Sequence, residues 1–176
     1  MAIPEKSRRD HSGRLRAGQC AGKGSSLSLK PSGAEGPVPL AEDCLFAYGS
    51  LMYPEVWGLL TGGGHRREPA RIHGFNRRRR RGEVYPVVFA GSESVEGILY
   101  WGLSAGELER LDRFEGSEYQ RRRVAATTAG GRRVEAWVYV FTGDPREVGE
   151  DPWDPGWFER EGLEAFLSAY RGFQSA

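Results

Sequence analysis

Residues 104–116 read SAGELERLDRFEG and form the most clearly marked element of the chain, a helix set between strand-like runs. Ser104 and Glu107 match the capping box of a helix N-terminus. Gly116 suits the C-terminal cap, so the pattern predicts a helix over about residues 105–114. Because strand-like runs both precede and follow this helix, the predicted fold class is α+β.

The flanking runs are short, rich in β-branched and aromatic residues, and separated by turn residues. The last two runs are joined by Ala129-Gly130-Gly131 and are expected to form a hairpin. The second of them has few polar residues on either face, which indicates a central strand. The expected strands cover residues 44–48, 70–79, 84–90, 95–101, 119–128 and 132–142.

Two further helices are expected. Pro54 suits the first position of a short helix that follows the first strand. Asp154 as N-cap and Pro155 as first residue mark the start of a final helix, with Gly172 after its end. One side of this helix is apolar and is expected to pack on the rest of the fold through Leu163, Phe166, Leu167 and Tyr170. The chain therefore contains about six strands and two or three helices.

Length and composition predict a single folded domain. The chain has 176 residues, 39% of them hydrophobic, which is enough for one core. Residues 1–42 show neither a helical nor a strand period and carry seven Lys or Arg against four Asp or Glu. They are expected to form a disordered basic leader before a domain at 43–176. The remainder carries 18 basic against 20 acidic residues, so it is not a generic polyanion binder.

Several classes of protein are excluded by the composition. No run of about 18 apolar residues exists, so no membrane span is predicted, and the N-terminus lacks the pattern of a secretory signal. Cys20 and Cys44 cannot form a disulfide framework, which indicates a reducing, cytoplasmic environment. They also lack the close-spaced partners of a zinc site, so no metal is predicted.

Glu115 is the most informative residue for chemistry. Leu108, Leu111 and Glu115 follow one another at helical spacing, which places a carboxyl group on the stripe that faces the core. Partial burial disfavours the charged form and raises the pKa toward the range of a general acid/base at neutral pH. The alternative is a frayed helix end with Glu115 in water. Asp112 and Glu118 are nearby candidates, each interpreted first as a surface or capping residue.

A second candidate site is the turn Tyr48-Gly49-Ser50-Leu51, where a strand ends and the chain turns toward a helix. Glycine allows close approach, so consecutive backbone N–H groups in such a turn can face an anion. The alternative is an ordinary strand-to-loop turn. The motif matches neither a phosphate-binding P-loop nor a dinucleotide-binding glycine motif.

Five consecutive arginines, Arg77–Arg81, invite a nucleic-acid interpretation. Strand alternation places Arg77, Arg79 and Arg81 on one face and Arg78 and Arg80 on the other. We favour a solvated edge strand or its exit, where charge blocks aggregation. An arginine that holds a small carboxylate ranks second, and phosphate binding ranks last because no aromatic platform is interleaved with the run.

Four short motifs occur in a specific order and separation. They are FAYGSL at 46–51, GEVYP at 82–86, VEGILY at 95–100 and LDRFEG at 111–116, followed by Tyr119 and Arg121. In these motifs the chain resembles the γ-glutamylcyclotransferase-like family of the AIG2-like type. The resemblance covers about residues 44–142, and the C-terminal extension at about 153–173 does not map onto a member of known substrate.

The resemblance implies a small mixed β-barrel, its core at about 44–142, with two or three helices packed around it. It also implies a pocket at the barrel mouth, where the glycine turn and Glu115 face each other. Family members of known activity cyclise a γ-glutamyl group to 5-oxoproline and release the attached amine, without a cofactor. Glu115 would be the general acid/base.

The other expected site residues bind the substrate. Backbone N–H groups of Gly49, Ser50 and Leu51 would hold the substrate carboxylate or the developing oxyanion, and Tyr48 and Tyr119 would shape the pocket. The expected partner is a small γ-glutamyl compound, with neither a membrane nor nucleic acid favoured.

The alternative function is a non-catalytic domain of the same fold that binds a small ligand or a partner. The sequence leaves open the oligomeric state and the choice among γ-glutamyl amino acids, γ-glutamylamines, a γ-glutamyl-protected intermediate and glutathione, which is least favoured.

Overall fold

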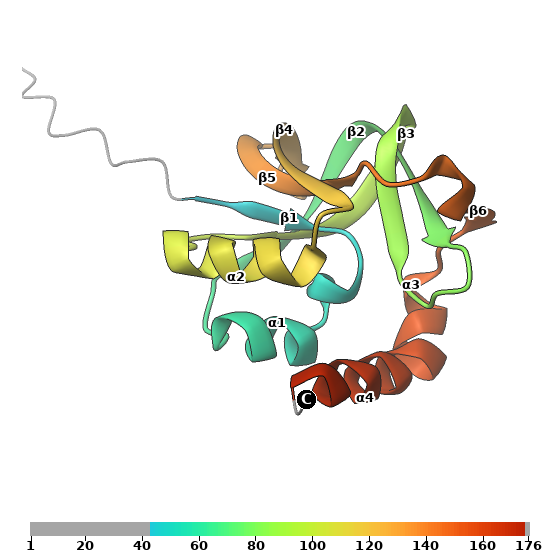
Figure 1. Ribbon diagram of the computed structural model, residues 1–176. Coiled ribbons are helices and arrows are strands. Elements are labelled where there is room, and N and C mark those ends of the chain that lie inside the picture. Colours follow the sequence, from blue (N-terminus) through green and yellow to red (C-terminus); the bar gives the residue numbers. More distant parts are fainter. Residues whose placement is uncertain (1–42, 175–176) are drawn as a thin grey trace, which may run out of the picture. The chain divides into compact units, whose positions relative to one another are not determined.

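The computed structural model describes the backbone of residues 43–174 and the side chains of residues 43–170 (Figure 1). The expected leader at 1–42 lies outside the described residues. The strands are β1 (Leu45–Ala47), β2 (Arg67–Arg80), β3 (Pro86–Tyr100), β4 (Tyr119–Thr128), β5 (Arg133–Phe141) and β6 (Val148–Pro152). The helices are α1 (Pro54–Thr61), α2 (Ala105–Glu115), α3 (Pro155–Trp157) and α4 (Leu163–Gln174), with a π-helical turn at Phe158–Gly162 and 3-10 turns at Ser50–Met52 and Pro145–Glu147.

Five strands close into a mixed barrel. Their order is β3-β1-β5-β4-β2, and β2 pairs in turn with β3, which completes the ring. β1 is parallel to β5, whereas the other neighbouring pairs of the ring are antiparallel. β6 adds a sixth strand alongside β2. The predicted α+β class, the small mixed barrel, the hairpin at 129–131 and the central position of β5 are confirmed.

Two apolar clusters hold the domain together. One fills the barrel, where side chains such as Phe46, Ile72 and Val138 are almost fully buried. The other lies between the barrel and the helices α1, α2 and α4, which gather on one side of it (Figure 1). Here Trp57 of α1 stacks on Tyr100 of β3, with ring centroids 3.7 Å apart and planes 5° from parallel. This second cluster packs directly beneath the residues of the candidate site, since it includes Leu51, Leu108 and Leu111.

Helix α2 begins as its sequence predicts. The Ser104 side chain accepts a hydrogen bond from the Glu107 N–H, and the Glu107 carboxylate accepts one from the Ser104 N–H at 2.8 Å. The Gly116 N–H closes the helix by donating to the carbonyl of Asp112. The helix thus continues through Glu115, one residue beyond the predicted end, which fixes the direction of this side chain.

The predicted break between two strands at about residues 91–94 is wrong, because β3 runs without interruption from 86 to 100. Small polar residues there suggested a turn. Instead, the side-chain oxygen of Asn76 accepts hydrogen bonds from the N–H groups of Ser92 and Glu93, and β2 carries a register shift between His73 and Phe75. β2 and β3 therefore form a continuous pair of long strands with one irregularity in register.

The arginine run does not lie on an edge strand, so that interpretation is wrong. β2 pairs with β3 on one side and, at Arg78 and Arg80, with β6 on the other. β6 was not predicted, because its five residues contain Gly, Asp and Pro and have no strand period. The partners are Glu93 for Arg78, Asp151 for Arg79, Glu118 and Glu147 for Arg80, and backbone carbonyls for Arg77 and Arg81.

The two other expected helices are present. Pro54 is the first residue of α1. The Asp154 side chain caps the C-terminal segment by accepting from the Gly156 N–H at 2.8 Å. The predicted end before Gly172 is wrong, since α4 continues to Gln174, and a glycine within a helix costs only about 1 kcal/mol. No helix in the described part of the chain is long and apolar enough to cross a bilayer.

Candidate active site

The side chain of Glu115, at the end of α2, is partly buried and its carboxyl group lines a pocket. Leu108 and Leu111 are buried on the stripe that faces the core, and Glu115 follows one turn later on the same stripe. Burial raises the pKa of Glu115 to about 8 from an ordinary value of 4.5. Near neutral pH this group can therefore both accept and donate a proton, which is the requirement for a general acid/base.

The turn that follows β1 is held by close packing and two backbone hydrogen bonds. The Met52 N–H donates to the carbonyl of Gly49 at 2.9 Å, and the Tyr53 N–H donates to that of Ser50 at 3.2 Å. The ring of Pro86 lies so close to Gly49 that a Cβ atom there would be 2.8 Å from Pro86 Cγ. Only glycine fits beside this ring without a shift, so the FAYGSL and GEVYP motifs meet at this contact.

A small recess joins this turn to Glu115. It has a volume of about 30 Å³, comparable to the space of one water molecule. The turn and loop hydrogen bonds of the described residues do not use the N–H groups of Gly49, Ser50 and Leu51 as donors. The structure therefore brings the predicted turn and the predicted carboxyl group to one place. The recess is lined by residues 46–51 together with Tyr85, Pro86, Glu115 and Tyr139.

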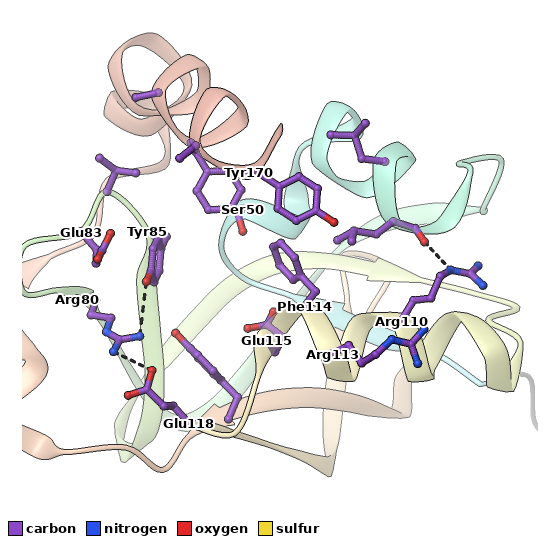
Figure 2. Close-up of a pocket in the computed structure, with 17 residues that line it drawn as sticks. Ser50, Arg80, Glu83, Tyr85, Arg110, Arg113, Phe114, Glu115, Glu118 and Tyr170 are labelled. Carbon is purple, nitrogen blue, oxygen red and sulfur yellow. Dashed lines mark hydrogen bonds and ion pairs between the residues drawn. The ribbon is translucent and has the colours of Figure 1, made fainter. Parts of the chain in front are cut away.

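A much larger pocket, of about 980 Å³, opens on the other side of Glu115 (Figure 2). Its walls come from α1, α2, α4 and the β2–β3 turn. Ser50 and Glu115 line both the pocket and the recess, so they stand where the two spaces join. A substrate in the pocket can thus reach the carboxyl group and the turn together.

The two tyrosines predicted to shape the site differ in position. Tyr48 is buried in the barrel, and its hydroxyl donates to the Tyr139 carbonyl at 2.8 Å. This bond anchors the first residue of the turn to β5. Tyr119 lines the large pocket. Burial, with the nearby charge of Glu115, raises the pKa of Tyr119, so its hydroxyl stays protonated and can donate a hydrogen bond.

The two other carboxylates near the helix end are engaged elsewhere. Asp112 accepts a hydrogen bond from the Tyr139 hydroxyl at 2.8 Å and pairs with Arg121 at 3.0 Å. Glu118 lines the pocket, but its carboxylate is paired with Arg80 at 2.8 Å. Unlike these two, Glu115 forms no ion pair among the described residues, and burial raises its pKa.

Several pocket residues were not predicted as site residues. Tyr85 stands in the GEVYP motif and Arg80 is the fourth residue of the arginine run, yet neither pattern shows that the side chain lines a pocket. Arg80 reaches the pocket and its guanidinium lies 3.5 Å from the Tyr85 hydroxyl (Figure 2). The α4 residues Phe166 and Tyr170 were expected only to pack on the barrel. Among the described residues, no group of three or more His, Cys, Asp or Glu side chains could hold a metal ion.

The family model for gamma-glutamyl cyclotransferase, AIG2-like, matches residues 45–159. The chain belongs to this family. Among its relatives in the family, AIG2-like protein C of Arabidopsis thaliana is 35% identical over 133 residues, which cover 73% of this chain and 76% of the relative. The matched region contains all four motifs, and with them the turn at 48–51 and Glu115.

Solved structures of AIG2-like and related proteins share the fold. A protein from Arabidopsis thaliana with a solution structure has a TM-score of 0.58 and 28% identity, covering 76% of this chain and 82% of its own. A gamma-glutamyl cyclotransferase has a TM-score of 0.51 at 19% identity, covering 60% of this chain and 73% of its own. The second likeness shows the fold alone.

Proposed function

We propose that this AIG2-like protein is a γ-glutamylcyclotransferase, which converts a γ-glutamyl compound to 5-oxoproline and a free amine. The observation that carries the proposal is the Glu115 carboxyl group, placed between the pocket and the glycine turn with a pKa of about 8. Membership of a family named for this reaction supports it.

Glu115 would serve both proton transfers of the reaction. It accepts a proton from the α-amino group as the nitrogen attacks the substrate's own γ-carbonyl carbon and a new C–N bond forms. The same carboxyl group then gives the proton to the departing amine nitrogen as the original C–N bond breaks. Proton transfer by a positioned group contributes about 10²–10⁴ in rate. The attack is intramolecular, so proximity is built into the substrate.

The backbone N–H groups of the glycine turn would bind a negatively charged oxygen of the substrate. Gly49, Ser50 and Leu51 line the same recess as Glu115, and their N–H groups donate none of the turn and loop hydrogen bonds among the described residues. They suit either the substrate α-carboxylate or the oxyanion that develops on the γ-carbonyl oxygen. Tyr119, kept protonated by burial, adds a hydroxyl donor on the pocket side.

Product analysis tests the proposed reaction. The full-length protein is incubated with a panel of γ-glutamyl amino acids and γ-glutamylamines, and the products are separated and quantified. We expect 5-oxoproline and the free amine in equal amounts. Glutamate in place of 5-oxoproline would show hydrolysis by water and contradict the proposal. Binding of panel members without any product would support a ligand-binding domain instead.

The pH dependence of turnover should follow the raised pKa of Glu115. Below pH 8 the carboxyl group is mostly protonated and cannot accept the α-amino proton. We expect kcat/KM to rise about tenfold per pH unit up to about pH 8 and then to level off. Initial rates of 5-oxoproline release between pH 5.5 and 9.5 measure this profile. A midpoint near pH 4.5 would show that the catalytic carboxyl group is not the buried one.

A further inference from the structure

The large pocket extends well past Glu115, farther than a γ-glutamyl group requires. The recess has room for one small group only, such as a carboxylate or carbonyl oxygen, so the rest of the γ-glutamyl group lies in the pocket beside Glu115 and the larger part of the 980 Å³ is left for the group attached through the γ-amide. Figure 2 shows the pocket continuing from Glu115 below α4 toward the arginines of α2. The side chains that line this remaining part of the pocket therefore indicate which kind of amine is released.

An aromatic wall lines the middle of the pocket. Phe114 of α2 meets Tyr170 and Phe166 of α4 edge to face, with centroids 5.4 and 6.3 Å apart, and Phe166 meets Tyr85 in the same way at 6.0 Å. Leu59 of α1 adds an apolar side chain that is 45% exposed, the one large hydrophobic residue so exposed among those described. A wall of this kind stabilises an apolar or aromatic group.

Two arginines stand along the pocket on α2. The Nε of Arg110 donates to the Leu60 carbonyl at 2.8 Å, which fixes this side chain at the pocket edge (Figure 2). Arg113 lines the same pocket, and within the described residues it has neither an ion pair nor a hydrogen bond. A guanidinium group binds a carboxylate through two parallel N–H donors, so this pair suits an anionic ligand group.

The opposite end of the pocket has a different charge pattern. Arg80 is there, but Glu118 and Glu147 neutralise it. Glu83 is also at this end, and it is exposed and forms no ion pair among the described residues, so this end carries acidic rather than basic unpaired charge. Unpaired positive charge is therefore found at the end that holds Arg113, next to Phe114 of the aromatic wall.

We propose that Arg113, aided by Arg110, determines the leaving group and selects an amino acid with an aromatic or large apolar side chain through its free carboxylate. The inference rests on the proposed function and names the substrate class of the same site. The aromatic wall takes the side chain, and the two guanidinium groups take the carboxylate. Amines that lack this carboxylate are poorer substrates, and those with a second positive charge are poorer still.

Three compounds test the selection. γ-Glutamyl-phenylalanine has the ring and the carboxylate, γ-glutamyl-phenethylamine has the ring alone, and γ-glutamyl-cadaverine has a terminal ammonium group and no ring. We expect kcat/KM to fall in this order, with about a tenfold step between the first two. Arg113→Gln should remove most of that step by lowering the value for γ-glutamyl-phenylalanine only. Arg113→Lys should retain part of it, and Arg133→Gln, an exposed arginine on β5, should change nothing.

Binding to Glu115→Gln, measured by calorimetry with and without Arg113→Gln, separates recognition from turnover. The expected tenfold preference for γ-glutamyl-phenylalanine, lost with Arg113, supports the inference even if no 5-oxoproline forms, in which case the proposed reaction alone fails. The inference is overturned if γ-glutamyl-cadaverine binds best, if Arg113→Gln weakens all three compounds equally, or if none of them binds.

Discussion

Glu115→Gln should raise the free energy of unfolding by about 3–4 kcal/mol at pH 7–8. In the folded protein burial raises the pKa of this carboxyl group to about 8, whereas in the unfolded chain it titrates near 4.5. The folded state therefore binds the proton more tightly. Stability falls as the pH rises from about 4.5 to 8, because the unfolded chain gains free energy by ionising while the folded state does not. Glutamine has the same shape and never ionises, so it removes this penalty.

Urea unfolding at several pH values measures the effect. The gain should be near zero at pH 4.5, grow as the pH rises and be complete above pH 8. Glu109→Gln is the matched control, since Glu109 is exposed on the same helix and does not line the pocket, and it should change stability little at any pH. A loss of stability in Glu115→Gln across the whole range would show that the carboxyl group makes a stabilising interaction instead.

Gly97→Ala should destabilise the domain by about 3 kcal/mol or more. A Cβ atom at Gly97 would lie 2.1 Å from the carbonyl oxygen of Ala47 and 2.7 Å from the ring of Phe46. The first of these is backbone, so no change of rotamer relieves the contact. β1 must move away from β3, and because the Tyr48–Leu51 turn follows β1 directly, the site should be displaced as well.

The control for this substitution is Gly58→Ala in α1. A Cβ atom there meets nothing within 4 Å, so the added methyl group should stabilise the helix by about 0.5–1 kcal/mol. Denaturant midpoints of the two variants should thus move in opposite directions from wild type. A midpoint for Gly97→Ala within error of wild type would mean that β1 and β3 do not approach as closely as described.

Local signals in the sequence explain which parts of the fold were predictable. The capping box of α2, the prolines that open α1 and α3, and the glycine hairpin act within a few residues, and each was found where expected. Glu115 could be singled out because helical spacing extends the core stripe of Leu108 and Leu111 to it. The contact between Gly49 and Pro86 gives a physical reason for the joint occurrence of two of the motifs.

Long-range contacts explain what could not be predicted. β3 continues through residues 91–94 because Asn76, on another strand, holds its backbone. β6 has no strand pattern of its own and exists through its pairing with β2. Likewise, the apolar face of α4 predicted packing, but not that Phe166 and Tyr170 would line the pocket beside Phe114. Such partners are chosen by the folded barrel rather than by neighbouring residues.

The most direct test of the account compares 5-oxoproline release by wild type, Glu115→Gln and Glu109→Gln at pH 8, with γ-glutamyl compounds as substrates. Wild type and Glu109→Gln should form 5-oxoproline at the same rate, and Glu115→Gln should be slower by about 10²–10⁴ while remaining folded. Equal rates in wild type and Glu115→Gln would contradict the central claim that the buried carboxyl group of α2 transfers the proton.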